Sequence, residues 1–366
     1  MSSTALSFSV TKNPSPVTAQ EREKILRDPG FGVYFTDHMV TIDWDVKNGW
    51  HNAQVVPYGP LSLDPAAAVL HYAQEIFEGL KAYRHDDGTI STFRPEANAE
   101  RFAQSARRLA LPELPVDVFI ESLRQLVAVD SDWVPDSEGE KSLYLRPFMI
   151  ATEPFLGVDS AKEVKYVLIA SPAGPYFAGG VKPVDIWLST NFTRAALGGT
   201  GEAKCGGNYA ASLEPQQKAY EHGCKQVLFL DAESHTYIDE LGGMNIMFVT
   251  DKQELITPVL TGSILHGVTR RSILELARHR GLKTEERRIS IDDWRQGVAD
   301  GTIREVFACG TAAVINPLAE LRAPEFSIPA APDTPGPVTM SLRKELTDIQ
   351  FGRAEDPFGW VVVLKK

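Results

Sequence analysis

The chain has 366 residues, of which 43% are hydrophobic and 23% charged, the composition of an ordinary globular protein. This length predicts two domains, each large enough for its own core. The formal net charge of −11 argues against nucleic acid or an anionic membrane surface as a partner. Small anionic ligands remain compatible with this net charge, because their binding depends on the charged groups close to the site.

The three cysteines, Cys205, Cys224 and Cys309, are widely spaced and form no C-x-x-C pair. This pattern indicates a reducing compartment without a disulfide framework. No H-E-x-x-H or Cys/His ligand spacing occurs, so we expect no metal. Residues 1–14 resemble neither a secretory signal nor a transit peptide, and no apolar run is long enough to span a bilayer. We therefore expect a soluble cytoplasmic protein.

Apolar spacing and turn residues predict strands and helices in both halves of the chain. After a loosely ordered segment that ends at a turn over 28–30, strands are expected at 33–35, 39–43, 90–93, 144–146 and 165–171. Helices are expected at 97–111 and 116–129, followed by a solvated acidic loop at 130–140. Later strands are expected at 185–189, 226–231, 237–248 and 306–309, with helices at 210–222 and 262–280.

A stretch rich in proline and glycine, residues 171–180, is the best candidate for a linker. The sequence therefore predicts a mixed α/β protein of two domains. We place a smaller N-terminal α/β domain at residues 1–174, an interdomain linker at 175–183 and a larger C-terminal domain at 184–366.

Lys204 lies in the glycine-rich string GGTGEAKCGGNY, residues 198–209. Glycines let the backbone come close to a ligand, so this lysine can project into a confined site. Confinement disfavours the ammonium form, and a partly neutral amine can attack a carbonyl. The string has neither the Gly-Lys-Ser/Thr of a Walker loop nor the third glycine of G-x-G-x-x-G. Two interpretations stay open from this string alone: a Schiff-base lysine, or a glycine-rich loop with an exposed lysine.

Other positions in the second half suit a phosphorylated cofactor. Glu240 precedes a Gly-Gly pair at a break in a strand, Val268 and Thr269 lie early in a predicted helix, and Thr311 follows a strand that ends in glycine. Backbone N–H groups at helix starts and glycine breaks, together with Thr hydroxyls, form phosphate sites. A lysine, a buried carboxylate and a phosphate cradle together meet the requirements of pyridoxal phosphate.

Seven short strings then follow one another in a specific order. They are FTDHM (35–39), FEGLKA (77–82), FRP (93–95), SLYLRP (142–147), EP (153–154), KCGGNY (204–209) and ELGGMN (240–245). In this order they resemble the branched-chain amino acid aminotransferases, which are fold-type IV enzymes that depend on pyridoxal phosphate. The resemblance runs from about Phe31 to the C-terminal region, and it is the joint order of the strings that makes it specific.

The resemblance implies a role for each cofactor contact. Lys204 would form the aldimine with pyridoxal phosphate and shuttle the proton between the substrate α-carbon and C4′ of the cofactor. Glu240 would face the pyridinium nitrogen, and Tyr209 would contact the ring oxygen. The phosphate would be bound by Arg101, Val268, Thr269 and Thr311.

The resemblance also implies a substrate site of aromatic, basic and small residues: Tyr72, Phe77, Tyr144, Arg146, Tyr176, Ala312 and Ala313. The aromatic part would take an aliphatic side chain, and Arg146 with tyrosine hydroxyls would take the second carboxylate of glutamate. Because such sites borrow residues from a neighbouring chain, a homodimer is expected. Gly243 departs from the family, in which threonine is frequent at this position, and puts one substrate contact in doubt.

The function implied is a reversible transamination in two half-reactions. L-Leucine, L-isoleucine or L-valine would give its amino group to the cofactor and leave as a branched 2-oxo acid, and 2-oxoglutarate would take the group to become L-glutamate. Preference among the three should be shallow, because one methylene in a hydrophobic pocket is worth only about 1–3 kcal/mol.

Two other functions stay open. One is a D-amino acid aminotransferase or aminodeoxychorismate lyase on the same fold, and the other is a cofactor-free binding protein on the same scaffold. Single residues also fit ordinary structural roles. Arg101 could form an ion pair at the surface, and Glu240 could belong to a turn. Tyr72 and Tyr144 could be core aromatic residues, and Cys205 could be a small packing residue.

Overall fold

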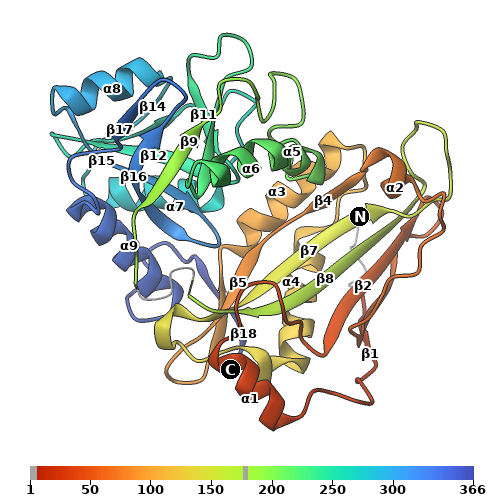
Figure 1. Cartoon of the computed structure of the whole chain (residues 1–366). Coiled ribbons are helices and arrows are strands. Elements are labelled where there is room, and N and C mark those ends of the chain that lie inside the picture. Colours follow the sequence, from red (N-terminus) through yellow and green to blue (C-terminus); the bar gives the residue numbers. More distant parts are fainter. Residues whose placement is uncertain (1–5, 176–179) are drawn as a thin grey trace. The chain divides into compact units, whose positions relative to one another are not determined.

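The computed structural model describes residues 6–175 and 180–366, and the chain divides into two compact units (Figure 1). The first unit comprises Met1–Tyr176, Ala203–Gly206 and Ile349–Lys366, and the second comprises Phe177–Glu202 and Gly207–Asp348. The segments 203–206 and 349–366 therefore belong to the first unit, whereas the division drawn from sequence placed both in the second domain. Strands and helices occur in both units, which confirms the mixed α/β class.

In the described part of the first unit, nine strands form one sheet in the order β1-β3-β2-β8-β7-β5-β6-β18, with β4 also paired to β7. Their bounds are β1 Ser9–Val10, β2 His38–Asp45, β3 Gly49–Pro57, β4 Glu75–Phe77, β5 Leu80–Arg84, β6 Ile90–Phe93, β7 Ser142–Ala151, β8 Glu163–Ala173 and β18 Val361–Lys365. Because β18 pairs with β6, the C-terminal segment completes a sheet that starts near the N-terminus.

Helices α3 and α4 lie along one face of this sheet (Figure 1). The helices of the unit are α1 Ala19–Arg27, α2 Ala68–Tyr72, α3 Pro95–Arg108 and α4 Val116–Val129, with 3₁₀ turns at Ser131–Trp133 and Glu138–Glu140. Three buried rings, Phe102 of α3, Phe119 of α4 and Tyr166 of β8, join the layers, with centroids 5.6 to 6.4 Å apart. The helix predicted at 116–129 is confirmed, and the one predicted at 97–111 starts and ends slightly earlier.

Three expectations for this unit are wrong. Helix α1 forms in the segment expected to be loosely ordered, because the Thr18 hydroxyl accepts a hydrogen bond from the Glu21 N–H and caps it. Residues 33–35 form no strand. The acidic loop is not solvated throughout, since Asp130 is buried and its carboxylate accepts hydrogen bonds from the backbone and ring of His38.

In the described part of the second unit, nine strands form a sheet in the order β11-β10-β9-β16-β15-β12-β13-β14, with β17 paired to β16. Their bounds are β9 Val184–Leu188, β10 Gln226–Leu230, β11 Ile238–Leu241, β12 Asn245–Thr250, β13 Leu255–Pro258, β14 Thr284–Arg287, β15 Ile303–Gly310, β16 Val314–Arg322 and β17 Ser327–Pro329. The strand predicted at 237–248 is in fact two, β11 and β12, because the chain turns at Gly242, where φ is +58°.

The helices of the second half are α5 Gly206–Ala210, α6 Leu213–Glu221, α7 Val268–His279, α8 Ile291–Ala299 and α9 Pro337–Gln350. The helix predicted at 210–222 is divided between α5 and α6. Helix α7 begins later than the predicted residue 262. Gly262 has a φ of +100°, which a right-handed helix does not contain, and the backbone is still extended at the N-cap Gly267. No helix of the described residues is long and apolar enough to cross a membrane.

Helix α8 begins with a reciprocal cap between Ser290 and Asp293. The Asp293 N–H donates to the Ser290 hydroxyl at 2.9 Å, and the Ser290 N–H donates to the Asp293 carboxylate at 2.8 Å. We expect Ser290→Ala to lower the free energy of unfolding by about 1 kcal/mol, measured by urea denaturation.

The same cap predicts a pH dependence. Hydrogen bonds from Ser290 lower the pKa of Asp293, so this carboxylate stabilises the fold above the ordinary aspartate pKa, and that stability is lost as the pH falls through the lower folded value. The deficit of Asp293→Asn should therefore shrink as unfolding is measured from neutral pH downwards. Asp292→Asn, in the same turn but outside the cap, is the control, and the same loss in both variants would contradict the assignment.

Candidate active site

Lys204 belongs to a short segment whose backbone is bound on both sides within the first unit. Its N–H donates to Oγ of Ser105 at 2.9 Å, and its carbonyl accepts from the N–H of Phe77 at 2.9 Å. Two residues later, the Gly206 N–H donates to the carboxylate of Glu75. Cys205, between them, is buried in the core as a packing residue. The main chain at Lys204 is thus fixed, and movement of this residue is confined to its side chain.

Helix α3 holds the groups next to this segment. Asn98, Arg101 and Ser105 are three and four residues apart, so they share one face of the helix. Ser105 receives the lysine N–H, while Arg101 donates from Nε and Nη2 to the two oxygens of Glu78 at 2.7 and 2.8 Å. Asn98 adds a third hydrogen bond to Glu78 at 2.8 Å.

Glu78 is completely buried, yet it stays ionised. Burial alone would raise the pKa of this carboxyl, but the charge and hydrogen bonds of Arg101, with the charge of Lys204 and the bond from Asn98, lower it below its usual value. Arg101 is therefore ion-paired, as the alternative of a structural role predicted. The pair lies in the interior beside Lys204, however, and not at the surface.

Two basic side chains approach the aromatic ring of Phe77. Nζ of Lys204 is 4.7 Å from the ring centroid, and the guanidinium carbon of Arg146 is 4.8 Å from it. Tyr144 and Arg146 alternate along β7 and so face the same side of the sheet. Nη2 of Arg146 donates to the Tyr144 hydroxyl at 3.2 Å. The structure thus brings four predicted residues together: Lys204, Phe77, Tyr144 and Arg146.

Gly79 makes room for this cluster. A Cβ atom at this position would lie 2.0 Å from the Tyr144 hydroxyl oxygen, an impossible approach. The position of the Tyr144 side chain therefore requires glycine at residue 79, in the FEGLKA string. Of the other predicted substrate residues, Tyr72 ends α2, is 40% exposed and donates its hydroxyl hydrogen to the carbonyl of Leu156. Tyr176 lies outside the described residues.

Glu240 in the second unit is also a buried, paired carboxylate. Nη2 of Arg194 is 2.5 Å from its Oε2, and the N–H of Leu265 donates to the same oxygen at 3.4 Å. The same Nη2 donates to the carbonyl of Ser263 at 2.6 Å. This arginine therefore holds the Glu240 charge in one place.

The start of α7 is organised by Asn245. Its Nδ2 donates to the carbonyl of Leu265 at 3.1 Å, and a Cβ on Gly267 would lie 2.0 Å from its Oδ1. Gly267 is the N-cap of α7 and gives no side-chain cap, so the N–H groups at Val268 and Thr269 point out of the helix end. Such an end attracts anions.

Two threonine hydroxyls belong to the first turn of α7 and to the connection after β15. Thr269 is buried and Thr311 half-buried, and within residues 6–175 and 180–366 neither hydroxyl has a hydrogen-bond partner. Thr311, Ala312 and Ala313 form the turn between β15, which ends at Gly310, and β16; Cys309 of β15 pairs with Asn245. Donors of this kind at a helix N-terminus fit a phosphate group.

Tyr209, near the end of α5, packs on the turn that follows Glu240. A Cβ on Gly243 would lie 3.2 Å from Cε1 of Tyr209, a tight contact. The absence of a side chain at position 243 therefore leaves space that the Tyr209 ring uses.

Six residues of these clusters were not predicted from the sequence: Glu75, Glu78, Asn98, Ser105, Arg194 and Asn245. Glu78 lies inside the FEGLKA string, and the spacing of Asn98, Arg101 and Ser105 on a helix was a usable signal that a polar face is buried. For Glu75 and Arg194 no local pattern exists, because their partners are distant in sequence.

Comparisons with known proteins identify the family of this chain. Residues 75–321 match the amino-transferase class IV family. The chain is 58% identical to the branched-chain-amino-acid aminotransferase of Mycolicibacterium smegmatis over 367 residues, covering 100% of both chains. It superposes on the branched-chain amino acid aminotransferase of Escherichia coli with a TM-score of 0.74 and 26% identity, covering 90% of this chain and 99% of that one. The branched-chain amino acid aminotransferase of Thermobaculum terrenum in its PLP form gives a TM-score of 0.71 and 22% identity, covering 90% and 99%.

The chain therefore belongs to the class IV amino-transferases and has their fold. Within that family it stands with the branched-chain-amino-acid aminotransferases, as the full-length identity of 58% shows. The predicted family and fold are thus confirmed, and the cofactor is pyridoxal phosphate. The helix end, hydroxyls, buried Glu240 and Lys204 provide the kinds of group that this cofactor requires.

The Glu78 pair makes a testable prediction. Glu78→Gln leaves the guanidinium of Arg101 buried without its anion, and removing one partner of a buried pair costs about 3–5 kcal/mol. We expect a loss of that size in the free energy of unfolding, measured by chemical denaturation. Glu100→Gln, next to Arg101 but exposed, should change it by less than about 0.5 kcal/mol. Similar losses in both variants would show that the ion pair of Glu78 with Arg101 is not what stabilises the fold.

Proposed function

We propose that this chain is a branched-chain amino acid transaminase. It transfers an amino group reversibly between L-leucine, L-isoleucine or L-valine and 2-oxoglutarate, giving the branched 2-oxo acids and L-glutamate. The observation that carries the proposal is Lys204, whose backbone is held by Ser105 and Phe77 while its amine lies over an aromatic ring. The name of the relatives with high identity supports the choice of substrate.

Lys204 is proposed as the catalytic base and acid. Pyridoxal phosphate, when bound, supplies an electron sink for the charge that develops at the substrate α-carbon. The amine of Lys204 takes the proton from that carbon and delivers it to C4′ of the cofactor. A backbone anchored at Ser105 and Phe77 lets the side chain move while its root stays in place.

Glu240 and the phosphate donors are proposed to position the cofactor. Glu240 keeps the ring nitrogen protonated, and Arg194 orients its carboxylate. Tyr209 contacts the ring oxygen. The guanidinium of Arg101, held in place by Glu78, is proposed to contribute positive charge to the phosphate site. The full phosphate set is Arg101, Val268, Thr269 and Thr311.

The substrate residues are proposed to be Tyr72, Phe77, Tyr144, Arg146, Tyr176, Ala312 and Ala313. The ring of Phe77 offers an apolar surface for an aliphatic side chain. The Arg146 guanidinium and the Tyr144 hydroxyl, joined at 3.2 Å, offer a cation and a donor for the second carboxylate of glutamate. One cluster thus supplies both kinds of contact that the two substrates need.

We also infer a cytoplasmic homodimer. Cys205, Cys224 and Cys309 are free and buried, which supports a reducing compartment. The dimer follows from the family resemblance, and sedimentation equilibrium of the purified enzyme tests it.

The substrate class is tested by assaying glutamate formation from 2-oxoglutarate with L-leucine and with D-alanine. Turnover with L-leucine alone supports the proposal. Turnover with D-alanine alone would assign the chain to D-amino acid transamination, and a sample that binds no cofactor would identify a binding protein.

Lys204→Ala should reduce transamination of L-leucine by at least about 10²–10⁴-fold, the contribution of a positioned acid–base group. The fold should persist, because the contacts that anchor this residue come from its backbone. Lys218→Ala, on α6 with a side chain that is 45% exposed, should keep full turnover. Substantial turnover in Lys204→Ala would refute the assigned role.

Glu240→Gln should slow proton abstraction more than it weakens cofactor retention. A neutral amide does not stabilise a protonated ring nitrogen, so the deuterium isotope effect on kcat with α-deuterated L-leucine should rise while kcat falls. Cofactor absorbance after gel filtration reports retention, and Glu221→Gln, at the exposed end of α6, is the control. A wild-type kcat in Glu240→Gln would remove the proposed electron-sink role.

A further inference from the structure

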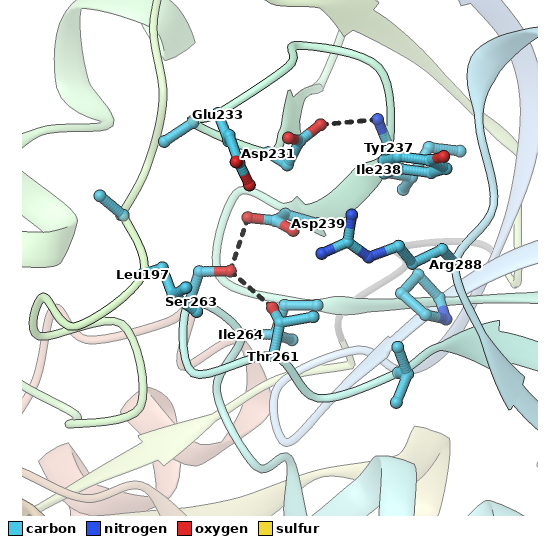
Figure 2. Close-up of a pocket in the computed structure, with 14 residues that line it drawn as sticks. Leu197, Asp231, Glu233, Tyr237, Ile238, Asp239, Thr261, Ser263, Ile264 and Arg288 are labelled. Carbon is cyan, nitrogen blue, oxygen red and sulfur yellow. Dashed lines mark hydrogen bonds between the residues drawn. The ribbon is translucent and has the colours of Figure 1, made fainter.

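A cavity of about 300 Å³ in the second unit includes none of the residues proposed above for cofactor or substrate (Figure 2). Its polar groups come from the connection between β10 and β11, from β11 itself, from the loop before α7 and from the segment after β14. Its apolar wall is formed by Leu197, Ile238, Val259 and Ile264. A concave apolar site with a few converging polar groups is the usual form of a small-molecule site.

Asp239 provides a buried acidic group in this cavity. It is 6% exposed, and its Oδ2 accepts a hydrogen bond from the Ser263 hydroxyl at 2.8 Å. No described residue donates to its other oxygen. Burial, with the like charge of Asp231, raises the pKa of Asp239, so a positive ligand here would relieve an unfavourable charge. Glu233, whose carboxylate also has no partner among the described residues, faces the same space (Figure 2).

Asp231 has a different role. Its carboxylate accepts the N–H groups of Ser234, Thr236 and Tyr237 at 2.7 to 2.9 Å. Although burial opposes them, these bonds lower the pKa of Asp231 to about 2. Its hydrogen-bonding capacity is thus used in building the turn over residues 231–237, so it adds negative charge to the wall without being available as a ligand.

Arg288 provides the opposite charge. Its guanidinium lies over the ring of Tyr237 at 4.9 Å and points towards Asp239 (Figure 2). In the described part of the chain it makes no hydrogen bond or ion pair through its side chain. The cavity therefore presents an anionic group and a cationic group, both without full partners, next to an apolar wall.

We propose that this cavity binds a free aliphatic L-amino acid. The ammonium group lies between Asp239 and Glu233, the carboxylate binds Arg288, and the side chain packs on the wall formed by Leu197, Ile238, Val259 and Ile264. A zwitterion satisfies both charges at once. A plain carboxylate would meet the acidic groups of the wall, and a plain amine would leave Arg288 without an anion.

The cavity is connected to Glu240 through Ser263. The hydroxyl of Ser263 donates to Asp239, and its carbonyl accepts from Arg194, which in turn binds Glu240. A ligand that draws Asp239 away from Ser263 therefore acts on the arginine that orients Glu240. This consequence rests on the proposed function, whereas binding in the cavity does not.

Isothermal titration of L-leucine into holoenzyme reduced with borohydride tests the site, because the reduced cofactor no longer exchanges its amine with a ligand. Two analogues dissect recognition: 3-methylbutylamine lacks the carboxylate and 4-methylpentanoate lacks the ammonium. We expect L-leucine to bind, and Arg288→Met to weaken it about tenfold while leaving 3-methylbutylamine unchanged. Glu233→Gln should weaken both. Arg295→Met, another arginine stacked on an aromatic ring, is the matched control and should change neither.

Absence of L-leucine binding in the wild type, or unchanged binding in Arg288→Met, would overturn the proposal. Both Arg288 and Glu233 are exposed, so their variants are expected to fold. Transamination by Arg288→Met at low substrate should equal that of the wild type. A protein that transaminates L-leucine but does not bind it in the cavity is therefore distinguishable from one that binds it in the cavity but does not transaminate.

Discussion

The buried ion pair between Glu78 and Arg101 is the interaction on which the lysine cluster depends. A completely buried carboxylate is tolerated because Arg101 binds both of its oxygens, and Asn98 and the Gly79 N–H add further hydrogen bonds. The helix that supplies Arg101 and Asn98 also presents Ser105 to the backbone of Lys204. One helix face thus determines where the buried anion lies and where the side chain of Lys204 begins.

The second unit uses the same physical device for a different purpose. Glu240 is buried and paired with Arg194, as Glu78 is with Arg101. Around it, Asn245 fixes the loop before α7, so the helix end faces a constant direction. A transaminase must stabilise charge without rearranging its own groups during the reaction, and pre-paired buried carboxylates meet that requirement.

Local patterns predicted the regular elements better than the polar clusters. Helix α4 has the bounds expected from its apolar spacing, because one continuous buried stripe is a signal contained within the helix itself. Helix α1 was missed, since it is short and mostly exposed and depends on the Thr18 cap. The burial of Asp130 was also missed, because its partner His38 lies 92 residues away.

The sequence by itself determined the family and the class of chemistry, and it predicted which groups react. Lys204 and Glu240 stand in short strings whose order is specific to one family, and the glycines around them are visible without coordinates. Only the tertiary structure decided which charge meets which partner. Glu78 and Arg101 are 23 residues apart, and Lys204 and Ser105 are 99 apart. Burial and pairing depend on how distant segments pack, and no local string of residues contains that information.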